Sequence, residues 1–413
     1  MLTRRTLLLS GAAVSTASAA MAQAPAARRP PAKPAHPPAQ AARPKRTEPV
    51  PTGSPAQTPI GPLDTAAKFA VALDFNTGAT LLDKDADVAM TPSSMTKLMT
   101  AYIIYGMLRA GRLKLDQELP VSERAWRMGG SKMFVPLNAS VKVEDLIRGM
   151  IVQSGNDACI VLAEGTAGSE EQFVELMNAK AKEIGLEHSR FRNTTGWPDP
   201  EHRMSARDIA VLARRIIMDF PEYYRYDAEK SFKYNNIDQE NRNTLVQKGL
   251  ADGLKTGHTD DGGYGIVVSA QRQGRRTIVV INGLTTMRQR GEEAERLLEW
   301  SFREFENVTL FTAGDTIEQA PVWLGTAASV PLVGGRDVVV TMPRGWRTKA
   351  RVALEYSKPI PAPISRGMTL GRLTVTGAGV PDLSLPLLAG ADVPRLGLPG
   401  RATAVLTRMV FGS

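Results

Sequence analysis

Three short groups of residues carry the side chains from which a serine acyl-transfer site could be built. They are Ser94-Met95-Thr96-Lys97, Ser154-Gly155-Asn156 and Lys255-Thr256-Gly257, in that order along the chain, and each pattern occurs once. Each is a weak signal alone, because a helix cap beside a solvated lysine, or an ordinary turn, produces the same letters. Together and in order, they predict a site that activates a hydroxyl group.

The first group contains a nucleophile and a base for it. An apolar pattern of helical period runs from about Met95 to Arg109, so Ser94 stands at a helix start, where free N–H groups favour negative charge. Lys97 follows three residues later on the same helix face, and its amine can reach the Ser94 hydroxyl. A serine alcohol is a poor nucleophile until a base takes its proton. A lysine can be that base when burial and a neighbouring cation lower its pKa.

The second and third groups are expected to complete the pocket. Lys255 would be the second cation beside Lys97. Ser154 and Asn156 are expected on a loop between two helices. There the Ser154 hydroxyl can pass a proton to the leaving amine, while the Asn156 amide fixes Lys97 or the substrate backbone.

The strand that carries Thr256 and Gly257 is expected to bind the substrate backbone. Gly257 leaves the strand edge bare, so that a peptide can lie against it. The backbone N–H groups of Ser94 and His258 would form the oxyanion hole.

Other catalytic chemistries lack the residues that they require. A Ser-His-Asp hydrolase would need Gly-x-Ser-x-Gly, which is absent, and zinc chemistry would need a His, Cys and carboxylate cluster at ligand spacing. We therefore expect no metal and no cofactor. The single cysteine, Cys159, cannot form an internal disulfide, and we expect it to be a small buried hydrophobe.

The charge of the chain is concentrated in its N-terminal part. The 413 residues carry a net charge of +9, and 43% of them are hydrophobic, enough for two domains with tails. Residues 1–63 hold eight basic residues and one acidic residue, while the other 350 hold 43 basic and 41 acidic residues. Because no basic face with interleaved aromatic residues is found, we expect no nucleic-acid partner.

The N-terminus has the pattern of an export signal over residues 1–22. The pair Arg4-Arg5 precedes an apolar, alanine-rich stretch, and Ala20-Met21-Ala22 offers a cleavage site. Both a Sec signal and a twin-arginine signal fit this pattern. The Ala- and Pro-rich residues 23–63 predict a disordered linker.

Periodicity in the remaining chain predicts a mixed domain over residues 64–308 and a small β-rich domain over 309–395. In the first domain we expect strands at 68–74, 79–82, 264–272 and 276–284, and helices at 143–151, 158–165, 169–184, 205–219 and 292–306. Ser169 and Ser205 are expected at helix starts. From about Leu310, short apolar runs alternate with Gly and Pro, including strands at 337–342 and 349–356.

The three groups and their neighbours resemble the low-molecular-mass penicillin-binding proteins, and among these the D-alanyl-D-alanine carboxypeptidases. The stretches that carry the resemblance are Pro92–Thr100, Gln153–Cys159 and Asp252–Thr259. The resemblance runs from about residue 66 to the end. It implies an α/β (α+β) β-lactamase/transpeptidase-like domain, with a central antiparallel sheet flanked by helices, followed by a small all-β domain.

The resemblance also implies an activity and roles for residues. The enzyme would remove the terminal D-alanine from peptidoglycan stem peptides ending in D-Ala–D-Ala, and β-lactams would inhibit it. Ser94 would be the acyl-ester nucleophile and Lys97 its general base, and Ser154 and Asn156 would complete the catalytic group. The carboxylate of the terminal D-alanine, or of a β-lactam, would be held by the third group, by the residue after it and by one arginine. These residues are Lys255, Thr256, Gly257, His258 and Arg242.

Two features depart from the family pattern. Ser93 stands where the family usually has Ala, and we expect it to cap the helix. Residues 396–413 form a short amphipathic tail with Leu398, Leu406 and Met409 on one stripe. The tail predicts peripheral contact with the outer face of the inner membrane, and the export signal predicts the periplasm.

Three alternatives remain open at this point. A β-lactamase shares the three groups, but the loop near Glu201 lacks the Asn partner of the deacylating Glu, and the β-domain favours a carboxypeptidase. D,D-endopeptidases of the same fold typically lack the second domain. A non-catalytic cell-wall-binding protein would not need intact Ser94, Lys97 and Lys255.

Overall fold

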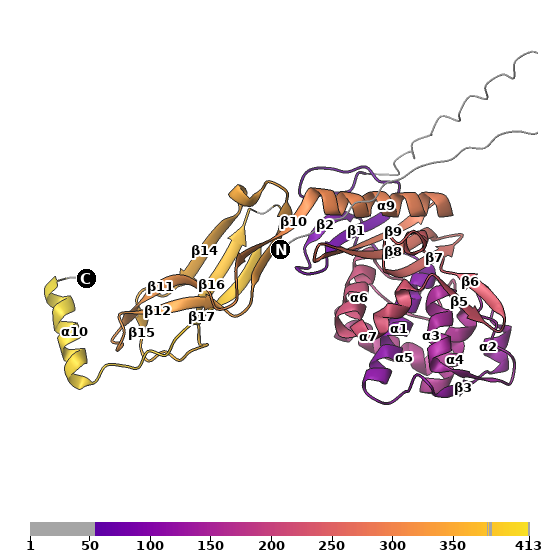
Figure 1. The fold of residues 1–413 in the computed structure, drawn as a ribbon, viewed down its shortest axis with the longest axis horizontal. Helices are drawn as coiled ribbons and strands as arrows, with labels where there is room; N and C mark the ends of the chain where they lie inside the picture. Colours follow the sequence, from indigo (N-terminus) through magenta and orange to yellow (C-terminus); the bar gives the residue numbers. More distant parts are fainter. Residues whose placement is uncertain (1–53, 378, 380–381, 412–413) are drawn as a thin grey trace, which may run out of the picture. The chain divides into compact units, whose positions relative to one another are not determined.

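The structure is a computed structural model that describes residues 54–377, 379 and 382–411, with the backbone alone at 407, 408, 410 and 411. The predicted export signal and residues 23–53 of the predicted linker therefore lie outside the described residues. The prediction of a disordered linker was wrong for residues 54–63, because backbone hydrogen bonds pair Ala56 with Leu63 and Gln57 with Asp83, and Ala56 is buried. Figure 1 shows a mixed domain, drawn from indigo to orange, and a β-domain drawn in orange and yellow.

A five-stranded antiparallel sheet forms the centre of the mixed domain, in the order β2-β1-β9-β8-β7 (Figure 1). Its strands are β1 (Phe69–Asp74), β2 (Thr80–Lys84), β7 (Gly253–Thr259), β8 (Gly263–Arg272) and β9 (Arg275–Leu284). The four strands predicted from periodicity are confirmed to within two residues at each end. The strand predicted around Thr256 and Gly257 is β7, and it lies at the edge of the sheet.

Alternate residues of each strand face two different hydrophobic cores. On β1, Val71 and Leu73 pack with the main group of helices, whereas Ala70 and Ala72 pack with α9 on the other face. Since side chains alternate across a strand, this two-sided burial explains why β9 is buried along its whole length. Figure 1 shows α9 on one face of the sheet and the remaining long helices on the other.

The helices agree with the prediction except at some of their starts. The long ones are α1 (Lys97–Arg109), α3 (Val143–Val152), α4 (Asn156–Ala167), α5 (Glu170–Glu183), α6 (Ala206–Asp219) and α9 (Met287–Glu304). The predicted caps are confirmed, because Ser169 and Ser205 each accept an N–H from the residue three positions on. The prediction of 292–306 for α9 was wrong at its start. Thr286 caps the helix by accepting the Gln289 N–H, and the polar residues after it hide the first turn from a search for apolar periodicity.

Several short elements were not predicted. They are the helices α2 (Glu123–Arg127), α7 (Pro221–Tyr224) and α8 (Thr244–Gln247), the turn η2 (Arg225–Ala228), and the pairs β3 (Glu118–Pro120) with β4 (Ser140–Lys142) and β5 (Ser231–Tyr234) with β6 (Ile237–Glu240). Each is at most five residues long, too short to give a clear period.

The second domain is built from strands around an apolar core, as predicted. Its strands are β10 (Phe305–Phe311), β11 (Thr316–Trp323), β12 (Ser329–Gly334), β13 (Val338–Pro343), β14 (Arg351–Tyr356), β15 (Ile360–Pro361), β16 (Thr369–Thr376) and β17 (Leu383–Ala389), with a short 3-10 turn, η3 (Arg347–Lys349). They form a six-stranded sheet, β14-β16-β17-β12-β11-β15, and the pair β10-β13. Val330, Leu332, Leu373 and Leu387 are among the fully buried residues of its core.

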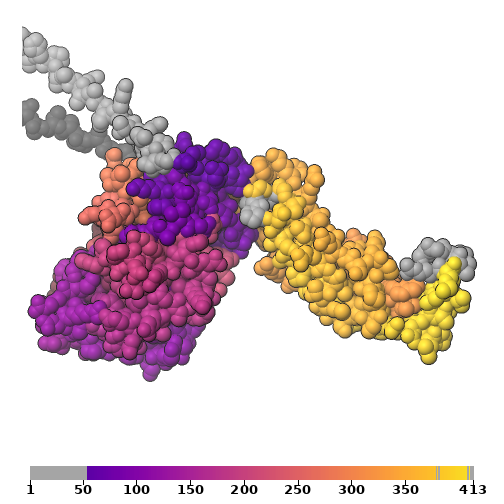
Figure 2. Space-filling model, turned by 180° about the vertical axis from the view of Figure 1, so that it is seen from behind, coloured from indigo at the N-terminus to yellow at the C-terminus, as the bar shows by residue number. Residues whose placement is uncertain are grey.

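The predicted amphipathic tail contains the helix α10 (Leu398–Phe411), which lies at the surface of the molecule (Figure 2). Leu398, Leu406 and Met409 are all exposed on it. In the part of the chain that the structure describes, no helix combines the length and apolar character needed to cross a bilayer.

Candidate active site

Ser94 lies in a tight turn immediately before α1. The turn η1 (Ser93–Thr96) is a 3-10 helix, so the α-helix begins at Lys97 and not at the predicted Met95. The neighbouring Ser93 does not cap a helix, and that prediction was wrong. Its backbone has φ +50°, and its hydroxyl contacts the Thr259 hydroxyl of β7 at 3.0 Å. Ser94 itself is partly exposed, so its Oγ is open to a substrate.

Lys97 is fully buried and bonds directly to the candidate nucleophile. Its Nζ lies 2.9 Å from Ser94 Oγ, 2.8 Å from Asn156 Oδ1 and 2.7 Å from the Thr195 carbonyl oxygen. None of these acceptors carries a charge. Burial therefore lowers the pKa of Lys97 from 10.5 to about 8, and the positive charge of Arg242 acts in the same direction. A neutral amine is thus accessible near physiological pH.

Ser154 and Asn156 meet the two lysines at the junction of α3 and α4. Ser154 adopts a left-handed backbone conformation with φ +60°, which turns the chain between the two helices. The expectation that both residues lie on a loop was wrong for Asn156, which is the first residue of α4. Its amide is held on both sides, because Oδ1 accepts from Lys97 and Nδ2 donates to the Gly129 carbonyl at 2.8 Å.

Lys255 reaches Ser154 from β7. Its Nζ donates to Ser154 Oγ at 2.9 Å and to the Thr256 carbonyl at 3.2 Å. Burial holds its pKa well below the usual range, and the positive charge of Lys97 lowers it further. The cation that lowers the pKa of Lys97 is Arg242, whereas Lys255 was expected to have that effect.

Gly257 was predicted only to leave the strand edge bare. The structure shows in addition that a side chain at this position would crowd its neighbours. A Cβ at this position would lie 3.0 Å from the Pro92 carbonyl oxygen and 3.3 Å from the Ser94 backbone nitrogen. The absence of a side chain therefore lets β7 approach the turn that carries Ser94. On either side of it, Thr256 is buried and His258 is exposed.

Arg242 is exposed, and its charge acts on Lys97. Its guanidinium donates to the Ser131 hydroxyl at 2.5 Å, and its backbone carbonyl accepts a hydrogen bond from Arg290 at 3.2 Å. Ser94, Lys97, Ser154, Asn156, Lys255, Thr256, Gly257, His258 and Arg242 thus come from distant parts of the chain to one region. Hydrogen bonds join Lys97 to Ser94 and Asn156, and Lys255 to Ser154.

Two supporting residues were not given a role by the sequence analysis. The buried Asp157 carboxylate accepts the backbone N–H groups of Met133, Phe134 and Val135, which fixes the segment that leads from the Gly129 carbonyl. Nothing in the local sequence around Asp157 points to this long-range contact.

Gly196 is the second supporting residue. It has φ +81°, and a Cβ there would lie 1.8 Å from the Ser93 carbonyl oxygen. A glycine is required at this position, and the local sequence does not show why. The reason is the close packing of the loop around Thr195 against the turn that carries Ser94.

Cys159 follows Asn156 on α4 but makes no hydrogen bond to Ser94. It is fully buried, and its thiol donates to the Gly155 carbonyl at 3.3 Å. Burial raises the pKa of the thiol to about 12, so the group stays protonated. Among the residues with described coordinates, no three His, Cys, Asp or Glu side chains gather as metal ligands would.

Comparison with known proteins gives the same assignment for both domains. Residues 55–286 match the D-alanyl-D-alanine carboxypeptidase family, and residues 305–395 match the C-terminal domain of penicillin-binding protein 5. The chain is 37% identical over 332 residues to D-alanyl-D-alanine carboxypeptidase DacC of Escherichia coli (strain K12), an alignment that spans 78% of this chain and 83% of that protein.

Solved structures are similar over more than half of this chain. Penicillin-binding protein 5 from Haemophilus influenzae is 36% identical with a TM-score of 0.75, over 81% of this chain and 99% of that one. Penicillin-binding protein D2 from Listeria monocytogenes, solved in an ampicillin-bound form, is 27% identical with a TM-score of 0.54, over 58% of this chain and 98% of that one. The chain therefore belongs to the D-alanyl-D-alanine carboxypeptidase family.

Proposed function

We propose that this D-alanyl-D-alanine carboxypeptidase acts through an acyl-enzyme on Ser94. Lys97 in its neutral form takes the Ser94 proton as Oγ attacks the carbonyl carbon between the two D-alanines. The peptide C–N bond then breaks, D-alanine leaves with a proton, and the remaining peptide is an ester of Ser94, which water hydrolyses. The observation that carries this proposal is the 2.9 Å contact between Ser94 Oγ and the Nζ of a fully buried lysine.

Ser154 is the proposed donor to the leaving amine. Its Oγ accepts a hydrogen bond from the Lys255 Nζ, so its own proton is free to point towards the substrate. A cation behind the hydroxyl favours proton release to the amine, and Lys255 can restore that proton. Asn156 keeps the Lys97 amine aimed at Ser94, since its amide is itself held by the Gly129 carbonyl.

The substrate carboxylate is proposed to lie between β7 and Arg242. Lys255 and Arg242 supply positive charge, and the Thr256 side chain supplies a hydroxyl donor. The backbone N–H groups of Ser94 and His258 are the proposed oxyanion hole, because the small Gly257 brings the two segments together. Peptidoglycan stem peptides and β-lactams both end in such a carboxylate beside a reactive carbonyl group.

Export to the periplasm is also proposed, from the paired arginines and apolar stretch of residues 1–22. Peripheral contact with the outer face of the inner membrane is proposed for α10, because its exposed Leu398, Leu406 and Met409 form an apolar stripe.

Mass spectrometry of the intact protein tests the assignment of the nucleophile. After incubation with penicillin, we expect the mass of one covalently bound antibiotic on the wild type and none on Ser94→Ala. With a pentapeptide ending in D-Ala–D-Ala, the wild type should release D-alanine and Ser94→Ala should not.

Ser93→Ala is the matched control, since it removes the adjacent hydroxyl and leaves Ser94 in place. It should still take the label. Labelling of a folded Ser94→Ala protein would refute the proposed nucleophile.

A further inference from the structure

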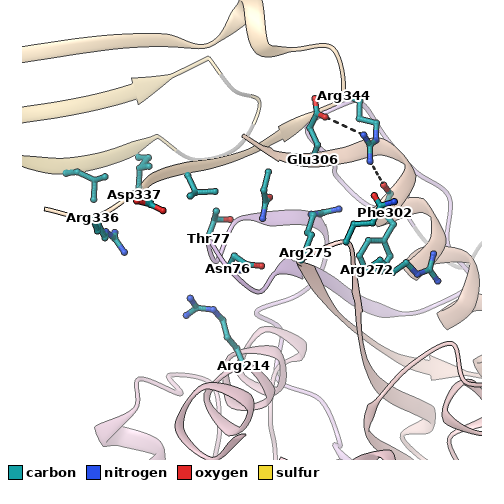
Figure 3. A pocket seen from close by; sticks show the side chains of 16 residues that line it. Asn76, Thr77, Arg214, Arg272, Arg275, Phe302, Glu306, Arg336, Asp337 and Arg344 are labelled. Carbon is teal, nitrogen blue, oxygen red and sulfur yellow. Dashed lines mark hydrogen bonds and ion pairs between the residues drawn. The ribbon is translucent and has the colours of Figure 1, made fainter. Parts of the chain in front are cut away.

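A second polar cavity, of about 820 Å³, lies away from the residues of the active site, where the mixed domain meets the β-domain (Figure 3). Its walls come from the β1–β2 and β8–β9 turns, α6 and the end of α9 on one side, and from β10, β13, β17 and the β12–β13 turn on the other. The size suits a small organic molecule, since ligand sites typically measure about 300–1,000 Å³.

The junction around this cavity is held by specific contacts. The Thr77 and Thr341 hydroxyls meet at 2.5 Å, and the Asn307 amide donates to Asp74 Oδ1 at 3.2 Å. These bonds tie the β1–β2 turn to the paired strands β10 and β13. These contacts fix the positions of the residues that form one wall of the cavity.

The lining carries an excess of positive charge. Five arginines line it, against two carboxylates, Glu306 and Asp337; the arginines are Arg214, Arg272, Arg275, Arg336 and Arg344. Three of them are neutralised, because Arg272 pairs with Glu299, Arg275 with Asp74 and Arg344 with Glu306.

The other two arginines have no carboxylate partner among the described residues. Arg214 donates through Nε to the Phe75 carbonyl at 2.7 Å, which leaves its two terminal nitrogens without a protein acceptor, and Arg336 has no side-chain hydrogen bond there. Figure 3 shows both guanidinium groups extending into the same part of the cavity, Arg214 from α6 and Arg336 from the β12–β13 turn.

A buried donor nearby also lacks an acceptor. The side chain of Arg275 is only 9% exposed, and its Nη2 has no hydrogen-bond partner in the described structure. A buried donor without an acceptor costs about 1–3 kcal/mol, so a ligand oxygen or a water molecule is expected close to the cavity wall.

We propose that this cavity binds a small molecule through a phosphate ester, with Arg214 and Arg336 holding the phosphate. One guanidinium fork satisfies both oxygens of a carboxylate, whereas a phosphate monoester has three terminal oxygens and can accept from two forks at once. The remaining volume takes the organic part, against Phe302, Leu383 and Leu385. The same monoester chemistry belongs to a soluble phosphate ester and to a phospholipid whose phosphate is terminal, as in phosphatidic acid.

Calorimetric titration of the full chain with sn-glycerol 3-phosphate, at constant ionic strength, tests the site. We expect binding that weakens by about tenfold or more in Arg336→Gln, since one charged hydrogen-bonded contact contributes about 1.5–3 kcal/mol. Arg336 is exposed, so this variant should fold normally, and D-alanine release should stay unchanged. The double variant Arg214→Gln/Arg336→Gln should abolish detectable binding.

The matched control is Arg112→Gln/Arg366→Gln, which removes one exposed arginine from each domain away from the cavity. It should bind the ester as the wild type does. Equal weakening in the control, no binding of the ester or of phospholipid vesicles, or tighter binding of succinate than of the ester would overturn the proposal.

Vesicles separate the two sources of the ester. Weaker binding of Arg336→Gln than of the control to phosphatidic acid vesicles, with no response to sn-glycerol 3-phosphate, supports a lipid headgroup. A response to sn-glycerol 3-phosphate alone supports a soluble ester.

Discussion

The mixed domain and the β-domain have interiors of different chemistry. In the mixed domain the buried side chains include Lys97, Lys255, Asp157 and Arg290. In residues 305–377, 379 and 382–395, the one buried polar side chain is Thr341, beside an aliphatic core. Buried charge is costly unless it is paired, and the two active-site lysines bond only to neutral acceptors. Burying the two lysines without charged partners therefore lowers the stability of the fold. The same burial lowers the pKa values of the lysines, on which catalysis depends.

The largest effect should come from removing the buried base. Lys97→Met keeps the side-chain length but removes the amine that contacts Ser94, so kcat/KM for D-alanine release should fall by about 10⁴-fold. Lys114→Met, at an exposed position, is the control and should leave kcat/KM unchanged. Substantial activity in a folded Lys97→Met protein would contradict its role as base.

Crowding the turn that carries the nucleophile should have the next largest effect. Gly196→Ala places a methyl group against the Ser93 carbonyl, and we expect kcat/KM to drop about 100-fold as Ser94 shifts. Gly78→Ala is the matched control. It also has positive φ but has open space around it, so it should cost only about 1–2 kcal/mol of stability. Equal effects of the two variants on kcat/KM would show that the close packing is irrelevant.

The pH dependence should report the lowered pKa of Lys97. The base works only when neutral, so kcat/KM should rise about tenfold per pH unit below the pKa and level off above about 8. Arg242→Gln removes a cation that lowers this pKa, so the inflection should move to higher pH; Arg112→Gln should not move it. An unchanged inflection in Arg242→Gln would argue against this electrostatic coupling.

The smallest effect on catalysis should come from the β-domain core. Leu387→Ala opens a cavity in a fully buried position and should lower the free energy of unfolding by about 2–5 kcal/mol. Because the core of the β-domain contains none of the active-site residues, kcat/KM should not change at a temperature where the protein stays folded. Calorimetry beside an activity assay measures both, and a fall in kcat/KM would show that the domains are coupled.

The sequence predicted what depends on local pattern. Apolar alternation located the strands of the central sheet, hydroxyl residues located two helix caps, and the three groups identified the residues that meet at the site. The start of α9 was missed because its first turn is polar, and its cap, Thr286, was not recognised. The 3-10 turn before α1 was missed because Ser93 adopts a left-handed backbone conformation there. A serine in the sequence does not predict that conformation.

Long-range packing set the limit of prediction within the site. The Asp157 carboxylate holds three consecutive backbone N–H groups about two dozen positions earlier, and Gly196 touches a carbonyl 103 positions earlier. Neither contact leaves a periodic trace, since each depends on how separate segments come together. The excess of arginine around the second cavity was hidden for the same reason, because its residues are scattered from position 76 to 385.

The burial of Cys159 has a practical consequence for handling the enzyme. A thiol that stays protonated and out of reach does not react with iodoacetamide, does not join two molecules into a dimer, and does not oxidise in air. With no second cysteine in the chain, the protein can be purified without reductant. A new cysteine engineered at the surface would then accept a fluorophore at that position alone.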